Sequence, residues 1–404
     1  MIRRMVACVL LLIIMVLPLS GCWGKEEVES LGFVFGMGID YGSKPGTYQV
    51  TYQIGLPKKA GEAGGGVEDY TISAEGFSMR DTTESIYKTI SRQPFVGTVK
   101  IIVIGEDVAR EGINKIVDFF HRYYQFRRTT YLVIAKGKAK DLLNIKLRTN
   151  QLVSLTLLDD IESGDLSSTF PTVRLGHYLT LLANVSSAPV IPLAFGVAPG
   201  EQGIEYVTED GEKPQEIHFS GAGVFQGDKL RTLLTDEETK GFMWLHNEVK
   251  QRYLNAKINN GQDNLFIGGR IIKTKTKARI EKKDNKYGIN YEIQLSADLD
   301  EVSLEQIQRS PEEYLKAVED ASEAIKNLII DECEAAINKS RELGIDFLGI
   351  GRKIEQSKPK YWKEIKDQWQ ELLPEFPITV SINFKWENGG SSFNPPINPV
   401  GTGQ

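Results

Sequence analysis

A single thiol follows the first apolar stretch of the chain. Cys22 ends the segment Leu19-Ser20-Gly21-Cys22, in which the two residues before the thiol are small enough to enter a peptidase cleft. Ahead of this segment, Arg3 and Arg4 supply positive charge, and an uncharged apolar run extends from Met5 to Leu17. This run is shorter than the roughly 20 residues that a helix needs to cross a bilayer. Residues 1–21 are therefore predicted to be a cleavable signal peptide and not a permanent membrane span.

The chemistry that this arrangement permits is acylation of the thiol. The pattern apolar, Ser, Gly, Cys resembles the bacterial lipobox, in which a diacylglyceryl group is attached to the cysteine and cleavage leaves that cysteine as the first residue. Two acyl chains give stable anchoring, whereas one chain gives only marginal binding. The resemblance implies lipid attachment at Cys22, followed by a short charged stalk at residues 22–30. The alternative is an ordinary secretory signal with an unrelated cysteine beyond the cleavage point.

The other candidates for chemistry favour packing over catalysis. Cys8 leaves with the signal peptide, so Cys333 is the one thiol left beside Cys22, and no intramolecular disulfide is expected. Cys333 lies on the apolar stripe of an amphipathic segment, which indicates a buried core residue. The four histidines occur singly, without zinc-site spacing, at positions 121, 177, 218 and 246. We expect no metal, no cofactor and no catalytic residues, because nucleophile-elbow, HExxH and phosphate-loop motifs are also missing from the sequence.

Two pairs of neighbouring acids raise the alternative of an envelope hydrolase. Asp159-Asp160 and Glu237-Glu238 supply the residue type that glycoside hydrolysis uses. Neighbours in sequence point in different directions on a helix, however. Solvated surface acids are therefore the simpler interpretation of both pairs.

The charge balance limits the partners of the chain. The formal net charge is −6 and becomes more negative once Arg3 and Arg4 are removed, so binding to nucleic acid or anionic lipid would need a local basic patch. Residues 121–128 interleave basic and aromatic side chains. The alternatives for them are a nucleic-acid contact, or aromatics that complete a core with arginines on its rim or paired with acids. We expect no nucleic-acid partner.

A second basic segment lies on a predicted strand. Four cations occupy alternate positions and therefore share one face, namely Lys273, Lys275, Lys277 and Arg279. That face is either solvated, or it contacts anionic lipid head groups or an acidic partner.

Apolar periodicity predicts a mixed α/β fold. Strands are predicted at 31–40, 48–56, 70–74, 98–104, 130–135, 191–197, 217–225, 229–234, 265–280, 287–299 and 377–386. Helices are predicted at 79–92, 108–120, 142–158, 173–182 and 311–341, with others after Thr235 and from 345 to 373. Because the first strands form a hairpin and later ones are joined by helical crossovers, the sheet is expected to be mixed.

The length of the chain suits two or three domains. We predict three domains, each with a mixed or antiparallel sheet flanked by helices: an N-terminal α/β domain at residues 31–188, a middle domain at 189–264 and a C-terminal α/β domain with a long helix at 265–386. Residues 387–404 are rich in Gly, Ser, Asn and Pro and are predicted to be a disordered tail.

Landmarks along nearly the whole chain resemble one family. They are short motifs in a specific order, namely Leu19-Ser20-Gly21-Cys22-Trp23 with Glu27, Gly36-Met37-Gly38-Ile39-Asp40, Ile104-Gly105-Glu106 with Ala109, Gly112 and Ile113, Asp118-Phe119-Phe120 with Arg122 and Arg128, Gly221-Ala222-Gly223-Val224-Phe225 with Asp228-Lys229-Leu230, and Asp346-Phe347-Leu348-Gly349-Ile350-Gly351 with Trp362 and Trp369. On these residues the chain is identified as a member of the Ger(x)C family, the lipoprotein C subunits of nutrient germinant receptors in spore-forming bacteria. It departs from the usual pattern at Gly24, Thr98, Leu348 and Ile350.

The resemblance implies a three-domain lipoprotein on the outer face of the spore inner membrane, assembled with two membrane-embedded partner subunits. It implies a role in assembly and signalling without catalytic residues, while a partner that resembles an amino-acid transporter holds the germinant site. The alternative is a lipid-anchored solute-binding protein that holds a small nutrient between lobes. The sequence names neither the germinant nor the partner subunits.

Overall fold

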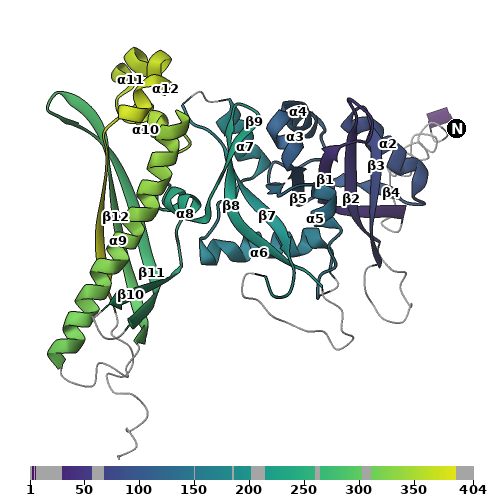
Figure 1. The fold of residues 1–404 in the computed structure, drawn as a ribbon. Coiled ribbons are helices and arrows are strands. Elements are labelled where there is room, and N and C mark those ends of the chain that lie inside the picture. Colours follow the sequence, from purple (N-terminus) through teal and green to yellow (C-terminus); the bar gives the residue numbers. More distant parts are fainter. Residues whose placement is uncertain are drawn as a thin grey trace, which may run out of the picture.

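The computed structural model describes residues 2, 3, 5, 30–56, 68–149, 151–183, 186–201, 214–259, 264–302 and 311–387. Within these ranges the chain forms two β-sheets, and helices pack on their faces (Figure 1). A larger sheet holds the N-terminal strands and a smaller sheet holds the C-terminal strands, with helix α8 between them (Figure 1). The predicted mixed α/β fold class is confirmed.

The larger sheet combines antiparallel and parallel pairing. Its strands follow the order β3-β2-β1-β5-β6-β7-β8-β9, and the short β4 lies beside β1. β1 to β3 form an antiparallel meander, β5 to β7 continue in parallel with β1, and β8 and β9 are antiparallel again. The strands are β1 (Leu31–Tyr41), β2 (Tyr48–Leu56), β3 (Glu68–Gly76), β4 (Gln93–Phe95), β5 (Ile101–Gly105), β6 (Tyr131–Ala135), β7 (Val190–Val197), β8 (Glu216–Gln226) and β9 (Lys229–Leu234).

Helices cover both faces of this sheet because its central strands are apolar on both sides. One face packs against α2 (Met79–Thr89), α3 (Glu106–Glu111), α4 (Asn114–Arg122) and α7 (Leu175–Leu182), which contribute buried residues such as Ile86, Ile116 and Tyr178. The other face packs against α5 (Ala139–Leu143) and α6 (Val153–Ser167) through Leu142 and Leu157. The sheet is therefore the middle layer of three.

Two of the predicted helices are interrupted. The helix expected at 108–120 is divided into α3 and α4 at Gly112, whose φ of 126° is left-handed and favours glycine. The backbone N–H of Asn114 then donates to the carboxylate of Asp228, 3.1 Å away on the β8–β9 turn. The helix expected at 142–158 is divided into α5 and α6, because the chain between them pairs with a distant segment, where the backbone N–H of Gln215 donates to the carbonyl of Lys146.

The smaller sheet has the order β10-β11-β12-β13. Its strands are β10 (Tyr253–Asn259), β11 (Asn264–Lys283), β12 (Lys286–Val302) and β13 (Ile378–Trp386). β11 and β12 form a long hairpin, and β13 lies parallel to β12 at the edge. The sequence pattern missed β10, which is the other edge strand.

Helix α9 (Pro311–Leu343) crosses one face of the smaller sheet (Figure 1). Its apolar stripe is buried against the strands, as the spacing of three and four predicts, and includes Ala321, Ile325, Ile329, Cys333 and Ala336. Short helices follow before β13, namely α10 (Ile350–Ser357), α11 (Pro359–Ile365) and α12 (Trp369–Leu372).

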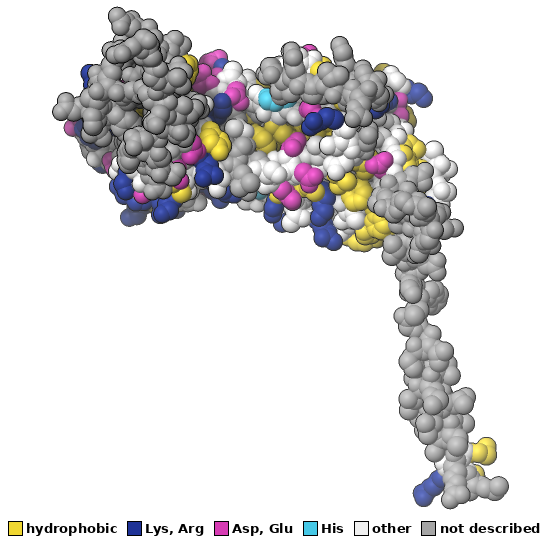
Figure 2. Space-filling model, turned by 90° about the horizontal axis from the view of Figure 1, so that it is seen from below, with side chains coloured by type: hydrophobic (Ala, Val, Ile, Leu, Met, Phe, Trp, Pro, Cys, Tyr) yellow, Lys and Arg dark blue, Asp and Glu magenta, His cyan; other side chains and the backbone are white. Residues whose placement is uncertain are grey.

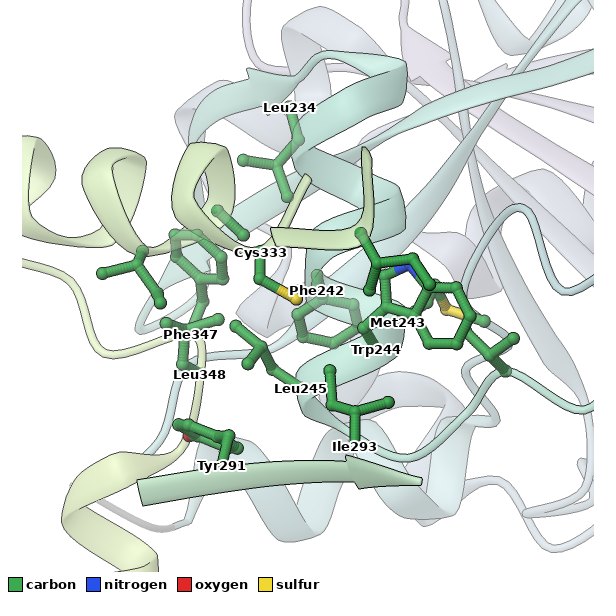
Figure 3. Packing of buried hydrophobic residues seen from close by; sticks show 14 of the residues in the cluster. Leu234, Phe242, Met243, Trp244, Leu245, Tyr291, Ile293, Cys333, Phe347 and Leu348 are labelled. Atoms are coloured by element: carbon green, nitrogen blue, oxygen red, sulfur yellow. The ribbon is translucent and has the colours of Figure 1, made fainter. Parts of the chain in front are cut away.

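Helix α8 (Asp236–Leu245) joins the two sheets. Thr235 and Glu238 form the capping box that starts it, in line with the helix start predicted at Thr235. Apolar side chains of α8 enter one buried cluster with residues of β8, β9, β12, α9 and the segment before α10 (Figure 3). A Cβ at Gly241 would lie 1.8 Å from the carbonyl oxygen of Glu332, so glycine permits the close crossing of α8 and α9.

The segment predicted to be a middle domain, residues 189–264, contributes strands to both sheets. β7 to β9 extend the larger sheet, in which Leu193 pairs with Ile134, while β10 belongs to the smaller sheet. The division into three domains stays a prediction. The part of the predicted tail from residue 388 onward lies outside the described residues.

Candidate functional site

The predicted lipid attachment site cannot be placed in the fold, because Cys22 and the stalk up to residue 29 lie outside the described residues. The first strand, β1, starts at Leu31 on the larger sheet. Among the helices that the structure describes, none is both long enough and apolar enough to span a membrane. Lipid attachment at Cys22 stays a prediction.

The four cations predicted to share a strand face lie on β11. Lys273, Lys275, Lys277 and Arg279 alternate with Thr274, Thr276 and Ala278, which face the buried strand residues Leu295, Ile293 and Tyr291 of β12. The cations therefore lie on the sheet face opposite the core. Arg279 pairs with Glu292 at 3.6 Å. On the face drawn in Figure 2, Lys and Arg side chains also gather along the edge at the left, where the smaller sheet lies.

The neighbouring acids show different environments. Asp159 is exposed, while Asp160 is half-buried, and burial followed by the charges of Asp159 and Glu216 raises the pKa of Asp160 to about 6. Glu238 closes the capping box and lies 3.5 Å from Lys339. Glu238 thus caps a helix and Asp159 is a surface residue, which agrees with the interpretation of these acids as structural or solvated side chains.

The aromatic and basic segment at 121–128 completes a core. Phe119, Tyr123 and Phe126 pack on one another with ring centroids about 6 Å apart, and Phe120 is buried beneath them. Arg122 forms an exposed ion pair with Asp118 on the preceding turn of α4. Tyr123 and Phe126 thus pack against the core and Arg122 lies on its charged rim, as that interpretation expects, while Tyr124 is exposed.

Cys333 is fully buried, and Figure 3 shows its thiol pointing into the cluster beside Phe242. Burial, and then the nearby charges of Glu332 and Glu334, raise the pKa of the Cys333 thiol. The predicted core position is confirmed. In the described ranges, no three His, Cys, Asp or Glu side chains are grouped so that they could hold a metal ion.

The motif that ends in Asp40 serves the backbone. The Asp40 carboxylate accepts hydrogen bonds from the backbone N–H groups of Ala139 and Lys140, both at 2.8 Å, and so holds the start of α5 at the end of β1. A Cβ at Gly105 would lie 2.2 Å from Asp40 Oδ1, and a Cβ at Gly36 would lie 2.3 Å from Ser154. Asp40 and these glycines are thus needed for close packing of helices on β1 and β5.

The motif that starts at Asp346 serves the same purpose in the C-terminal part. Its carboxylate accepts hydrogen bonds from the backbone N–H groups of Ile350 and Gly351, at 2.9 and 2.6 Å, and from Trp369 Nε1 at 3.0 Å. Burial raises the pKa of Asp346, and these three donors oppose the rise. Gly349 has a φ of 64°, which permits the turn into α10. Both motifs therefore define the fold.

A cavity of about 320 Å³ lies between α7, α8 and α10, and no sequence motif indicated it. His177, Ser187 and Arg352 line it from separate segments of the chain. They have no common spacing in the sequence, so only the folded arrangement brings them together.

Family models match both halves of the chain. Residues 24–194 match the model described as spore germination protein N-terminal domain, and residues 220–390 match the C-terminal model described as spore germination B3/GerAC like. Spore germination protein KC of Bacillus subtilis (strain 168) is 28% identical over 417 residues, covering 98% of each chain. Spore germination protein B3 of the same organism is 24% identical over 385 residues, covering 93% of this chain and 96% of that protein. The crystal structure of the GerBC protein has the same fold, with a TM-score of 0.55 and 20% identity over 88% of this chain and 98% of that chain.

The two-sheet fold and the two matching family models thus place the chain in a class of spore germination proteins. Because the two family models together cover most of the sequence, the chain belongs to the Ger(x)C family, as its motifs predict. Its relatives are named for spore germination, which supports a role in germination for this chain.

Proposed function

We propose that this chain is a membrane-anchored lipoprotein subunit of a nutrient germinant receptor and takes part in triggering spore germination. The observation that carries the proposal is the match of both halves of the chain to spore germination models. The motif residues support a role without catalysis, because the carboxylates of Asp40 and Asp346 already accept hydrogen bonds from backbone N–H groups. The subunit acts through assembly and signalling.

The proposed place of action is the outer face of the spore inner membrane. The lipobox pattern at Cys22 supports attachment there through a diacylglyceryl thioether. A tether at Cys22 lies nine residues before the start of β1, so it would hold that end of the larger sheet within about 30 Å of the lipid surface. Tethering raises the effective concentration of the protein at the membrane, which makes weak contacts with membrane-embedded partners sufficient for assembly.

The proposed partners are two membrane-embedded receptor subunits. The basic face of β11 is a candidate contact surface, because it presents four cations away from the core in a chain of net negative charge. An acidic partner loop or anionic head groups would complement it.

Replacement of Cys22 in spores tests the proposal. A Cys22→Ala chain is expected to incorporate no fatty acid and to be either soluble or retained as an uncleaved precursor. Spores that carry it are expected to germinate poorly with nutrients. Cys333→Ala is the matched control, because that thiol is buried and should leave acylation unchanged. Metabolic labelling with a fatty acid and co-purification from detergent-solubilised spore membranes are the measurements. Label in the Cys22→Ala chain would refute the anchor, and parental germination of spores that lack the whole chain would refute the receptor role.

A further inference from the structure

The cavity between α7, α8 and α10 lies where helices of the larger sheet meet helices of the smaller sheet. His177 and Leu181 of α7 form one wall, Phe242 of α8 and His246 directly after it form the second, and Arg352 of α10 forms the third. Ser187, in the segment before β7, completes the lining. The volume of about 320 Å³ is at the lower end of the range for small-molecule sites.

The walls of the cavity are partly apolar. Leu181, Phe242 and Phe347 contribute hydrocarbon surface, and Phe242 stacks on the imidazole of His246 with ring centroids 4.1 Å apart. A ligand for this cavity therefore has an apolar part of a few carbon atoms.

One polar group in the lining is buried without a partner, and two more at its edge have none among the described residues. The hydroxyl of Ser187 is buried without a hydrogen bond. In the part of the chain that the structure describes, the His177 imidazole and the Arg352 guanidinium also form no hydrogen bond or ion pair. Buried polar groups in proteins are nearly always satisfied, so the unsatisfied Ser187 hydroxyl indicates a polar group on the occupant of the cavity. His177 is exposed and Arg352 is half-buried, so both can donate to that group from the edge of the cavity.

The charge of the lining indicates the sign of that group. Burial and then the charge of Arg352 lower the pKa of His177, and burial and then the charge of Lys353 lower the pKa of His246 to about 3. Of the two cations, Lys353 already donates to the carbonyl of Leu348 at 3.0 Å, which leaves Arg352 available. Glu248 also lines the cavity, and Asp346 is held by backbone N–H groups nearby. An anion beside Arg352 would offset the positive charge that these imidazoles face.

We propose that this cavity binds a small organic monocarboxylate. The carboxylate lies against the Arg352 guanidinium, which matches it in geometry, and accepts hydrogen bonds from Ser187 Oγ and a His177 ring N–H. The apolar part packs against Leu181, Phe242 and Phe347. One available cation suits a monoanion, whereas phosphate as a dianion would be undercompensated.

Such a ligand would contact elements of both sheets at once. His177 belongs to a helix of the larger sheet, and Arg352 belongs to a helix that follows α9 on the smaller sheet. Binding would therefore stabilise the present arrangement of the two sheets against any other arrangement or unfolding. This binding site does not depend on the germination role.

Thermal unfolding of the full-length chain in detergent tests the proposal, with straight-chain carboxylates from acetate to hexanoate as probes. At least one of them, for example butyrate, is expected to raise the melting temperature in a saturable manner. Butyramide, which has the same shape without the charge, and inorganic phosphate are expected to give no saturable shift.

Variants separate the site from general salt effects. Arg352→Gln is expected to weaken carboxylate binding about tenfold or more, the loss of roughly one charge-assisted contact. Ser187→Ala, a smaller change that keeps the fold, is expected to weaken it severalfold. Arg122→Gln, which removes an exposed cation far from the cavity, should bind as the parent does. The proposal is wrong if no carboxylate in the series gives a saturable shift, if butyramide matches butyrate, or if Ser187→Ala and folded Arg352→Gln both bind like the parent.

Discussion

The Arg252 guanidinium forms a bidentate ion pair with the carboxylate of Glu332 on α9, in which Nη1 donates to Oε2 at 2.7 Å and Nη2 donates to Oε1 at 2.5 Å. Trp244 Nε1 donates to the same Oε2 at 2.7 Å. The Arg252 and Glu332 side chains are only 9% and 5% exposed. Arg252 directly precedes β10, and Trp244 lies in the last turn of α8. This network therefore holds the connection between the two sheets against α9.

Arg252→Met is expected to destabilise the protein by about 3–5 kcal/mol, because it leaves the Glu332 carboxylate buried without its cation. Urea unfolding followed by tryptophan fluorescence measures the loss. Arg122→Met is the matched control, since Arg122 and its partner Asp118 are 77% and 50% exposed and such pairs contribute about 0–1 kcal/mol. Equal losses in the two variants would contradict the importance of the buried network.

The pH dependence of stability should reveal the raised pKa of Asp160. The pKa of Asp160 is about 6 in the folded state and ordinarily 3.8, so the folded protein binds this proton more tightly than the unfolded chain does. The stability that the bound proton contributes is therefore lost as pH rises from about 4 to about 6. Asp160→Asn removes the unfavourable burial of the ionised carboxylate above that pH. Allowing for solvent screening of a half-exposed group, we expect it to stabilise the protein by about 1 kcal/mol at pH 7.5 and to have no such effect at pH 4.

Melting temperatures of the Asp160→Asn chain at the two pH values provide the measurement. Glu162→Gln is the control, because the Glu162 side chain is exposed on the same helix, whereas the charge of Asp159 itself contributes to the raised pKa of Asp160. An equal gain at pH 4 and pH 7.5 would mean that the amide acts through packing or helix propensity and not through charge.

Local periodicity explains which elements the sequence could predict. The stripe that includes Cys333 and the alternation around Lys275 are properties of single segments, and both appear in the structure as α9 and β11. The break at Gly112 could not be predicted in the same way, because it depends on Asp228 in a distant turn. The same limit applies to the pairing of β7 with β6 and to the cavity beside Arg352, since both require segments that meet only after folding.

The Cys333 thiol should react slowly with thiol reagents in the native protein. It is fully buried, and burial raises its pKa, so the reactive thiolate is scarce. Labelling of a chain with both Cys8→Ala and Cys22→Ala isolates this thiol. Its reaction with a maleimide should be complete within minutes in urea but much slower without urea. Fast labelling in the native state would show that α9 opens readily from the smaller sheet.

The basic face of β11 gives a test of how an anchored subunit could be oriented. Lys273, Lys275 and Lys277 lie opposite Ser296, Gln294 and Glu292 of β12 and point away from the core, so replacing all three by Gln should leave the fold intact. If the face meets anionic lipid or an acidic partner, each lysine contributes about 1 kcal/mol of attraction, and the triple variant should slow germination at an unchanged amount of protein. Triple replacement of Lys100, Lys115 and Lys229 by Gln controls for net charge, because these exposed cations lie just before β5, on α4 and at the start of β9. Germination rates in spores that carry each variant distinguish the alternatives: if the β11 variant germinates like the parent, or no more slowly than the control, the face is simply solvated.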